Sequence, residues 1–119
     1  MWVLATQVSS YTYNHVALSE EMFCDGYRNI FNIDSSYIVA QQMASHYKAK
    51  AIEMTYIHMD ARAMAYEDAS FDAVIDKGTL DSILSGDNST AGALAMFREI
   101  QRVLTPNGVY ICVTYGKQD

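Results

Sequence analysis

The sequence predicts an α/β fold in which a parallel β-sheet is flanked by helices. Three observations lead to this prediction. Strand-like apolar runs alternate with helix-like periods, three of these runs end at an aspartate, and 119 residues suit one small domain. Half of the residues are hydrophobic and 18% are charged, which is the balance of a globular protein. We therefore expect residues 1–119 to form a single domain.

The first half of the chain alternates between strand and helix. In order, we expect a strand at 2–8, a helix at 15–26, a strand at 28–34, a helix at 35–51 and a strand at 53–60. Gly26 suits the C-terminal cap of the first helix, because glycine readily adopts the left-handed conformation found there. Ser35 or Ser36 would cap the start of the second helix.

The second half continues this alternation. The strand "FDAVID" at 71–76 is followed by a short helix at 79–84, a long helix at 89–104 and a strand at 108–116. The long helix is expected to bury one apolar stripe formed by Leu94, Phe97, Ile100, Val103 and Leu104. "TPNG" at 105–108 predicts a turn before the last strand, because proline, asparagine and glycine favour turns.

Charge, cysteines and histidines narrow the possible partners and location. A net charge of −6 argues against a nucleic-acid surface and fits a basic protein or peptide partner better. The chain lacks the run of 18 apolar residues that a membrane helix needs and the pattern of a signal peptide, so we expect a cytoplasmic protein. Cys24 and Cys112 are interpreted as buried, reduced thiols, with a disulfide as the less favoured alternative. The histidines have no metal-ligand spacing, so we expect no metal site.

Three predicted strands end at an acid, namely Asp34, Asp60 and Asp76. The carboxyl ends of parallel strands meet at one edge of a sheet, where ligands bind, so these carboxylates should gather near one crevice. An acid at the end of the second strand can accept hydrogen bonds from the ribose hydroxyls of a nucleoside. For each acid taken alone, a role in starting a turn or capping a helix stays open.

Two stretches make the prediction more specific. "FDAVIDKGTLDSIL" followed by "MFREIQRVLTPNGVYICVTYG" is similar to the second half of a class I S-adenosylmethionine-dependent methyltransferase. "DGYRNIFNIDSSYIV" resembles the branch of that family that methylates lysines, notably on translation elongation factor 1-alpha. Together the matches cover roughly residues 18–116. The resemblance implies a Rossmann-like fold with strand order 3-2-1-4-5, S-adenosylmethionine as cofactor and a protein lysine as substrate.

The resemblance also implies which residues hold the cofactor. Asp34 would hold the ribose, with Ser35 beside it, and Asp60 with Ala61 would contact the adenine. The remaining two cofactor-binding residues would be Lys77, which would line the cleft, and Gly78, which would let the backbone come close.

We name no catalytic residue, because the sulfonium is already a strong electrophile and positioning an amine in line with it supplies most of the rate. Asp76 or Asp81 could help to orient a lysine ammonium, with helix capping as the alternative role for Asp81.

The chain departs from the family in two places. A glycine-rich loop should follow the first strand, yet the first glycine of the chain is Gly26. The family's sheet has further strands, so we expect a partial methyltransferase domain, truncated after its fifth strand. That strand would then be an open apolar edge, which predicts a homodimer or aggregation through residues 109–115.

Two functions therefore stay open: a protein-lysine methyltransferase, or a catalytically inactive or truncated relative that acts as a binding module. A dinucleotide-binding domain has no positive support without a glycine fingerprint.

Overall fold

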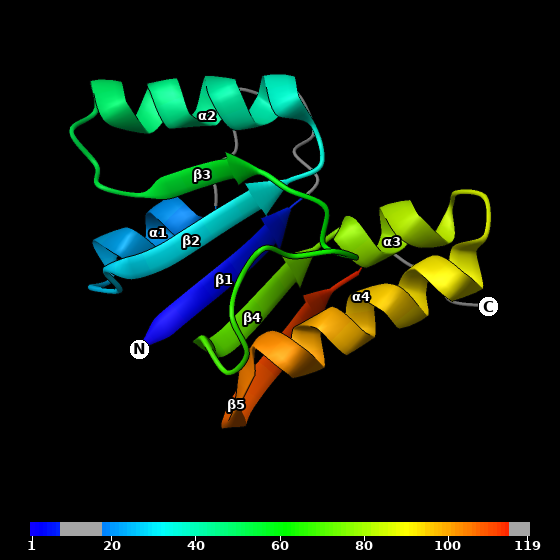
Figure 1. Cartoon of the computed structure of the whole chain (residues 1–119). Coiled ribbons are helices and arrows are strands. Elements are labelled where there is room, and N and C mark those ends of the chain that lie inside the picture. The colour runs from blue at the N-terminus through cyan, green and yellow to red at the C-terminus, as the bar shows by residue number, and fades with distance from the viewer. Residues whose placement is uncertain (8–17, 115–119) are drawn as a thin grey trace.

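The computed structural model describes residues 1–7 and 18–114 (Figure 1). Within these residues the strands are β1 (Trp2–Gln7), β2 (Asn29–Asp34), β3 (Thr55–His58), β4 (Phe71–Lys77) and β5 (Leu104–Val113). The helices are α1 (Leu18–Cys24), α2 (Tyr37–Ala49), α3 (Thr79–Leu84) and α4 (Ser89–Val103). Strand and helix thus alternate as the apolar pattern predicts. The first residues of the helix expected at 15–26 lie outside the described part of the chain.

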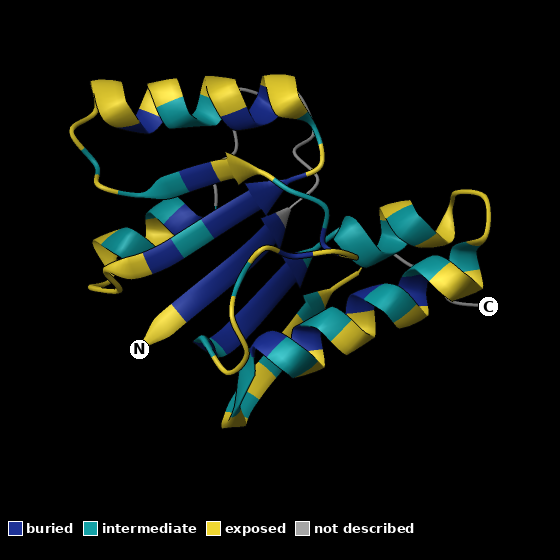
Figure 2. Cartoon of the chain, in the orientation of Figure 1, coloured by how far each residue is buried: buried dark blue, intermediate teal, exposed yellow. Residues whose placement is uncertain are grey.

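The strands form one sheet in the order β3-β2-β1-β4-β5, and all four pairings are parallel. This confirms the predicted α/β class and the order 3-2-1-4-5. β1 lies at the centre, where Val3, Leu4 and Ala5 are at most 2% exposed (Figure 2). Parallel sheets bury both faces in this way because crossover helices cover them.

The two faces of the sheet are covered by different helices. On one face the largest core cluster joins Leu4, Ile33 and Val74 of the strands to Met96 and Ile100 of α4. On the other face α1 packs through Leu18 and Met22, while α2 packs against β3. The sheet is therefore sandwiched between α3 and α4 on one side and α1 and α2 on the other (Figure 1).

Both predicted helix caps are confirmed. Gly26 has a positive φ of 108°. Its amide donates to the carbonyl of Phe23, and the amide of Tyr27 donates to that of Met22, which is the Schellman pattern. At the start of α2, Ser36 accepts a hydrogen bond from the amide of Val39 at 3.3 Å. Ser36, rather than Ser35, is thus the N-cap.

The apolar stripe predicted on the long helix is wrong at two positions. Leu94 and Phe97 are 50% and 41% exposed. The residues that face the sheet are Ala93, Met96, Ile100 and Val103. The physical reason is close packing against α3: a Cβ at Gly92 would lie 2.9 Å from a methyl carbon of Ile83, so the side of α4 that carries Gly92 and Ala93 faces inward. Leu104 already belongs to β5.

The turn predicted at 105–108 is instead a bulge inside β5. Leu104 pairs with Phe71 and Val109 pairs with Ala73. Residues 105–108 of β5 therefore stand opposite a single residue of β4, Asp72. The last strand consequently begins at Leu104 and not at residue 108.

The interpretation of the cysteines needs one correction. Both thiols are free, but Cys24 is exposed at the end of α1 and Cys112 is half-buried in β5. None of the helices in the described ranges is long and apolar enough to cross a bilayer. The same residues contain no cluster of three or more His, Cys, Asp or Glu side chains able to hold a metal ion.

Candidate cofactor site

A cavity of about 240 Å³ opens at the carboxyl edge of the sheet. Its lining comes from the ends of β1 and β2 (Thr6, Ile33, Asp34, Ser35), the segment after β3 (Met59, Asp60, Ala61, Arg62) and α3 with its following turn (Thr79, Ser82, Ile83, Gly86, Asp87). Four of the residues predicted to bind a cofactor, Asp34, Ser35, Asp60 and Ala61, thus lie in one cavity. Lys77 and Gly78 are not among the described residues that line it.

Asp34 is fixed where β2 ends. The residue is 4% exposed, and its carboxylate accepts a hydrogen bond from the amide of Ser36 at 2.8 Å. Its backbone carbonyl accepts from the amide of Met59 at 3.0 Å, which ties the end of β2 to the segment that follows β3. The carboxylate of Asp34 is therefore held in a fixed position at the cavity wall.

Asp60 is held by a residue that the sequence analysis missed. The Asp60 carboxylate accepts from the backbone amide of Arg62 at 2.8 Å and from its guanidinium at Nε (3.0 Å) and Nη2 (2.8 Å). These hydrogen bonds lower the pKa of Asp60 below its ordinary value, so the carboxylate is charged at neutral pH. An acid and a base two residues apart directly after a strand were the available signal.

Asp76 has a structural role beneath the cavity. It is fully buried in β4 and accepts hydrogen bonds from the amides of Thr79 at 2.8 Å and Leu80 at 3.2 Å, at the start of α3. The hydroxyls of Tyr110 at 2.9 Å and Thr6 at 3.4 Å donate to it as well. The hypothesis that Asp76 orients a lysine ammonium is therefore wrong, because its carboxylate is out of reach of a substrate.

Tyr110 and Cys112 surround the same buried carboxylate. The pKa of Tyr110 is raised above its ordinary value, mainly because the side chain is buried. Hydrogen bonds with Cys112 and Asp76 raise this pKa further. Burial also raises the pKa of the Cys112 thiol, whose Sγ lies 3.6 Å from the Asp76 carboxylate. Both side chains therefore stay neutral donors at physiological pH. Asp81, in the first turn of α3, hydrogen-bonds with Thr114.

The connection from β4 to α3 explains the position of Lys77 and Gly78. Gly78 has a φ of 83°, a conformation that favours glycine, and its amide donates to the carbonyl of Val113 at 3.2 Å. Lys77 is the last residue of β4 and half-buried. The next residues, Thr79, Ser82 and Ile83, reach the cavity because their spacing places them on one face of α3. That helical spacing was the signal by which they could have been found.

Comparison with known proteins supports the predicted family. The model of the family described as "Methyltransferase domain" matches residues 12–112. The chain is 38% identical over 102 residues to the human eEF1A lysine and N-terminal methyltransferase. The aligned region covers 84% of this chain and 15% of that protein. A bovine EEF1A lysine methyltransferase 4 is 35% identical over 106 residues, or 82% of this chain and 41% of that protein. The chain thus spans about 15% of the length of the first of these relatives.

Solved structures share the fold. A Methanococcus maripaludis protein superposes with a TM-score of 0.73 at 18% identity, over 93% of this chain and 47% of that one. An S-adenosylmethionine-dependent methyltransferase from Methanosarcina mazei gives a TM-score of 0.68 at 17% identity, over 87% and 47%. The resemblance based on "DKGTLD" and "DGYRNIFNIDSSYIV" is therefore confirmed. The chain belongs to the class I S-adenosylmethionine-dependent methyltransferase family, as a methyltransferase domain that resembles the eEF1A lysine methyltransferases.

Proposed function

We propose that this chain binds S-adenosylmethionine in the cavity at the carboxyl edge and takes part in methyl transfer to a lysine of a protein, with eEF1A as the substrate. One observation carries the proposal: Asp34 at the end of β2 and Asp60 with Ala61 after β3 line the same cavity. The substrate follows from the relatives, whose names specify lysine methylation of eEF1A. Because this substrate acts in translation, the proposal places the reaction in the cytoplasm.

The polar lining fits the nucleoside part of the cofactor. Asp34 would accept hydrogen bonds from the ribose hydroxyls, with Ser35 beside it at the cavity wall. Asp60 would accept from the amino group of the adenine, and the buried Ala61 would contact the ring. The cavity of about 240 Å³ is smaller than the range of roughly 300–1,000 Å³ for whole ligands of this size. The methionine part would therefore extend past the described lining, toward Lys77 and Gly78.

Positioning is the task that remains for the protein. The chemistry supplied by S-adenosylmethionine is a methyl group already activated on a sulfonium. The carboxylates of Asp34 and Asp60 would hold the nucleoside at two points, which fixes the direction in which the methyl group faces the incoming amine. No side chain of the protein needs to act as a nucleophile, because the substrate amine attacks the methyl group itself.

A second candidate function is a relative that no longer binds the cofactor and serves as a binding module. The sequence between β1 and α1 favours it, because no glycine precedes Gly26 where the family uses a glycine-rich loop. Glycine allows the tight turn and close backbone approach that the methionine end of the cofactor requires.

A transfer assay separates the two candidates. The chain is incubated with eEF1A and S-adenosylmethionine labelled with tritium on its methyl group, and the labelled peptides are identified. The proposal expects label on a lysine, its loss in Asp34→Ala and its retention in the matched control Asp25→Ala, an exposed acid beyond the end of α1. A folded wild-type chain that transfers no label to eEF1A would instead favour the binding module.

A further inference from the structure

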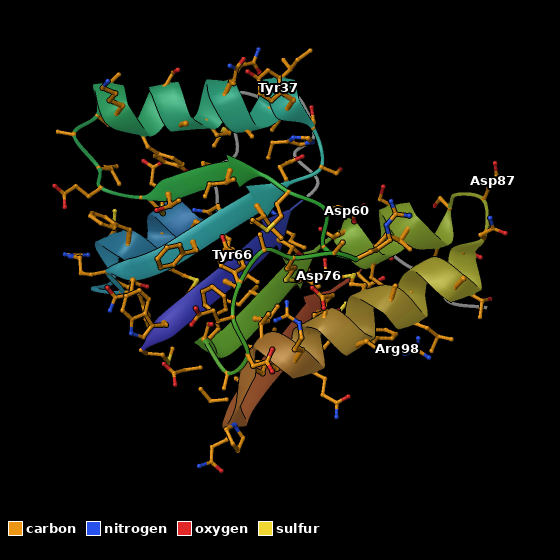
Figure 3. The ribbon with its side chains drawn as sticks, in the orientation of Figure 1. Tyr37, Asp60, Tyr66, Asp76, Asp87 and Arg98 are labelled. Atoms are coloured by element: carbon orange, nitrogen blue, oxygen red, sulfur yellow. The ribbon has the colours of Figure 1, made fainter. Side chains whose placement is uncertain are left out.

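Two charged side chains of α4 hold the loop that forms one wall of the cavity. This loop, residues 59–70, joins β3 to β4 and is called the β3–β4 loop below. Its first residues, Met59 to Arg62, line the cavity, and the loop contains no helix or strand of its own. Its position therefore depends on contacts with the neighbouring elements, and several of the polar ones come from Glu99 and Arg102. Tyr66, one of the loop residues that they contact, is labelled in Figure 3.

Arg102 uses all of its guanidinium donors at this place. Nε and Nη2 donate to the Glu99 carboxylate at 2.8 and 2.9 Å. Nη1 donates to the carbonyl of Tyr66 at 2.6 Å and to the carboxylate of Asp68 at 2.9 Å. Nη2 donates also to the carbonyl of Met64 at 3.1 Å. Since a guanidinium has five N–H donors in a fixed fork, this arrangement can be filled by arginine and not by lysine.

Glu99 closes the arrangement from the other side. Its carboxylate accepts a hydrogen bond from the amide of Met64 at 2.6 Å, so both backbone groups of this loop residue are bound by the pair. The Arg102 and Glu99 side chains are 30% and 18% exposed, which leaves their hydrogen bonds less screened than those of a surface pair.

The connection from this pair to the cofactor site is short. Met64 lies two residues after Arg62, and the carbonyl of Asp60 accepts from the amide of Ala63 at 3.1 Å in a tight turn. Ala61 and Met64 are both buried in the core cluster that contains Met96 of α4. A displacement at Met64 would therefore move the wall that carries Asp60 and Ala61.

We propose that Glu99 and Arg102 are positioning residues for cofactor binding: they set the place of the β3–β4 loop and thereby the affinity of the cavity for the nucleoside. The inference rests on the proposed function, which supplies the ligand. It assigns a role to two residues of α4 that do not line the cavity, unlike Asp34 and Asp60, which would bind the ribose and the adenine.

The test compares Arg102→Lys and Glu99→Gln with wild type and with the control Arg98→Gln. Arg98 lies exposed on α4 and forms no hydrogen bond or ion pair with any residue that the structure describes (Figure 3). Amide hydrogen exchange is measured on the cofactor-free proteins. The dissociation constant for S-adenosylmethionine is measured by calorimetry at a temperature where circular dichroism shows each variant to be folded.

The inference expects two changes that a general loss of stability would not produce. Amides of residues 60–66 exchange faster in Arg102→Lys and Glu99→Gln, while those of β1 and β4 keep their wild-type rates. The dissociation constant for S-adenosylmethionine rises about tenfold, which corresponds in free energy to the loss of one charge-assisted hydrogen bond that orders the loop. Arg98→Gln changes neither quantity.

Two results would overturn the inference: exchange at residues 60–66 that matches wild type, or faster exchange there with an unchanged dissociation constant. Failure of the proposed function looks different, because the wild type itself then binds no S-adenosylmethionine. In that case the exchange rates alone decide whether the pair positions the loop.

Discussion

The hydroxyl of Tyr110 in β5 donates a hydrogen bond of 2.9 Å to the carboxylate of Asp76 in β4. The same buried side chain accepts hydrogen bonds from the first amides of α3, so two strands and a helix meet at Asp76. Because Thr79 and Ile83 of α3 line the cavity, Asp76 supports the site without facing a ligand.

Removing this carboxylate should destabilise the whole domain. Asp76→Ala leaves half-buried donors at Thr79, Leu80 and Tyr110 without their acceptor, and we expect a loss on the order of 3 kcal/mol in the free energy of unfolding. Tyr110→Phe removes one donor only and should cost about 1–2 kcal/mol. Urea unfolding measures both values. An Asp76→Ala variant as stable as Tyr110→Phe would contradict the central place of this carboxylate.

The corrected face of α4 is testable by a pair of substitutions. Met96 is fully buried, so Met96→Ala should lower the free energy of unfolding by about 2–5 kcal/mol. Leu94 is 50% exposed, and Leu94→Ala should stay within about 0.5 kcal/mol of wild type. If Leu94→Ala proved the costlier change, the stripe predicted from sequence would be right after all.

Stability should depend on pH through Glu99. Hydrogen bonds from Arg102 lower the pKa of Glu99 in the folded chain. Between that lowered pKa and the ordinary glutamate pKa the unfolded chain binds more protons, so the free energy of unfolding rises with pH. The contribution is complete above the ordinary glutamate pKa and is lost as pH falls through the lowered one.

Urea unfolding between about pH 3 and pH 7 measures this slope. We expect a shallower acid slope in Glu99→Gln than in wild type, since the substituted side chain does not titrate. Equal slopes would mean that the ion pair with Arg102 does not persist in solution.

The outer edge of β5 should promote self-association. Val109, Ile111 and Val113 are 53%, 48% and 40% exposed and belong to none of the apolar clusters of the described residues. An apolar edge strand is a template for pairing with a second chain, so we expect dimers in light scattering at working concentration. Ile111→Lys should shift the population to monomer, because a charge on an edge opposes pairing. A monodisperse wild-type monomer would count against this prediction.

The sequence was sufficient for the order of the elements because apolar periodicity is a local property. It also indicated that Asp34 and Asp60 lie close together, because Asp34 ends β2 and Asp60 lies two residues beyond the end of β3, and both line one cavity. It could not place Leu94, because which face of an amphipathic helix meets the sheet depends on contacts such as Gly92 against Ile83.

The cavity wall formed by α3 also could not be predicted from local sequence alone. Lys77 and Gly78 stand out in the sequence, yet the lining begins one residue later at Thr79, since Gly78 turns the chain into the helix. The contacts of Arg102 with a loop more than thirty residues earlier in the chain leave no local pattern at all.

Cofactor binding is the central claim, and calorimetric titration of S-adenosylmethionine into the wild type and Asp34→Ala tests it most directly, with melting temperatures recorded alongside. We expect saturable binding to the wild type. At a hundredfold excess over the dissociation constant the stabilisation should be about 2.7 kcal/mol. Asp34→Ala should lose most of both effects, because it removes the acceptor for the ribose. A folded wild-type chain that gives neither heat nor a shift in melting temperature at millimolar cofactor would contradict the account.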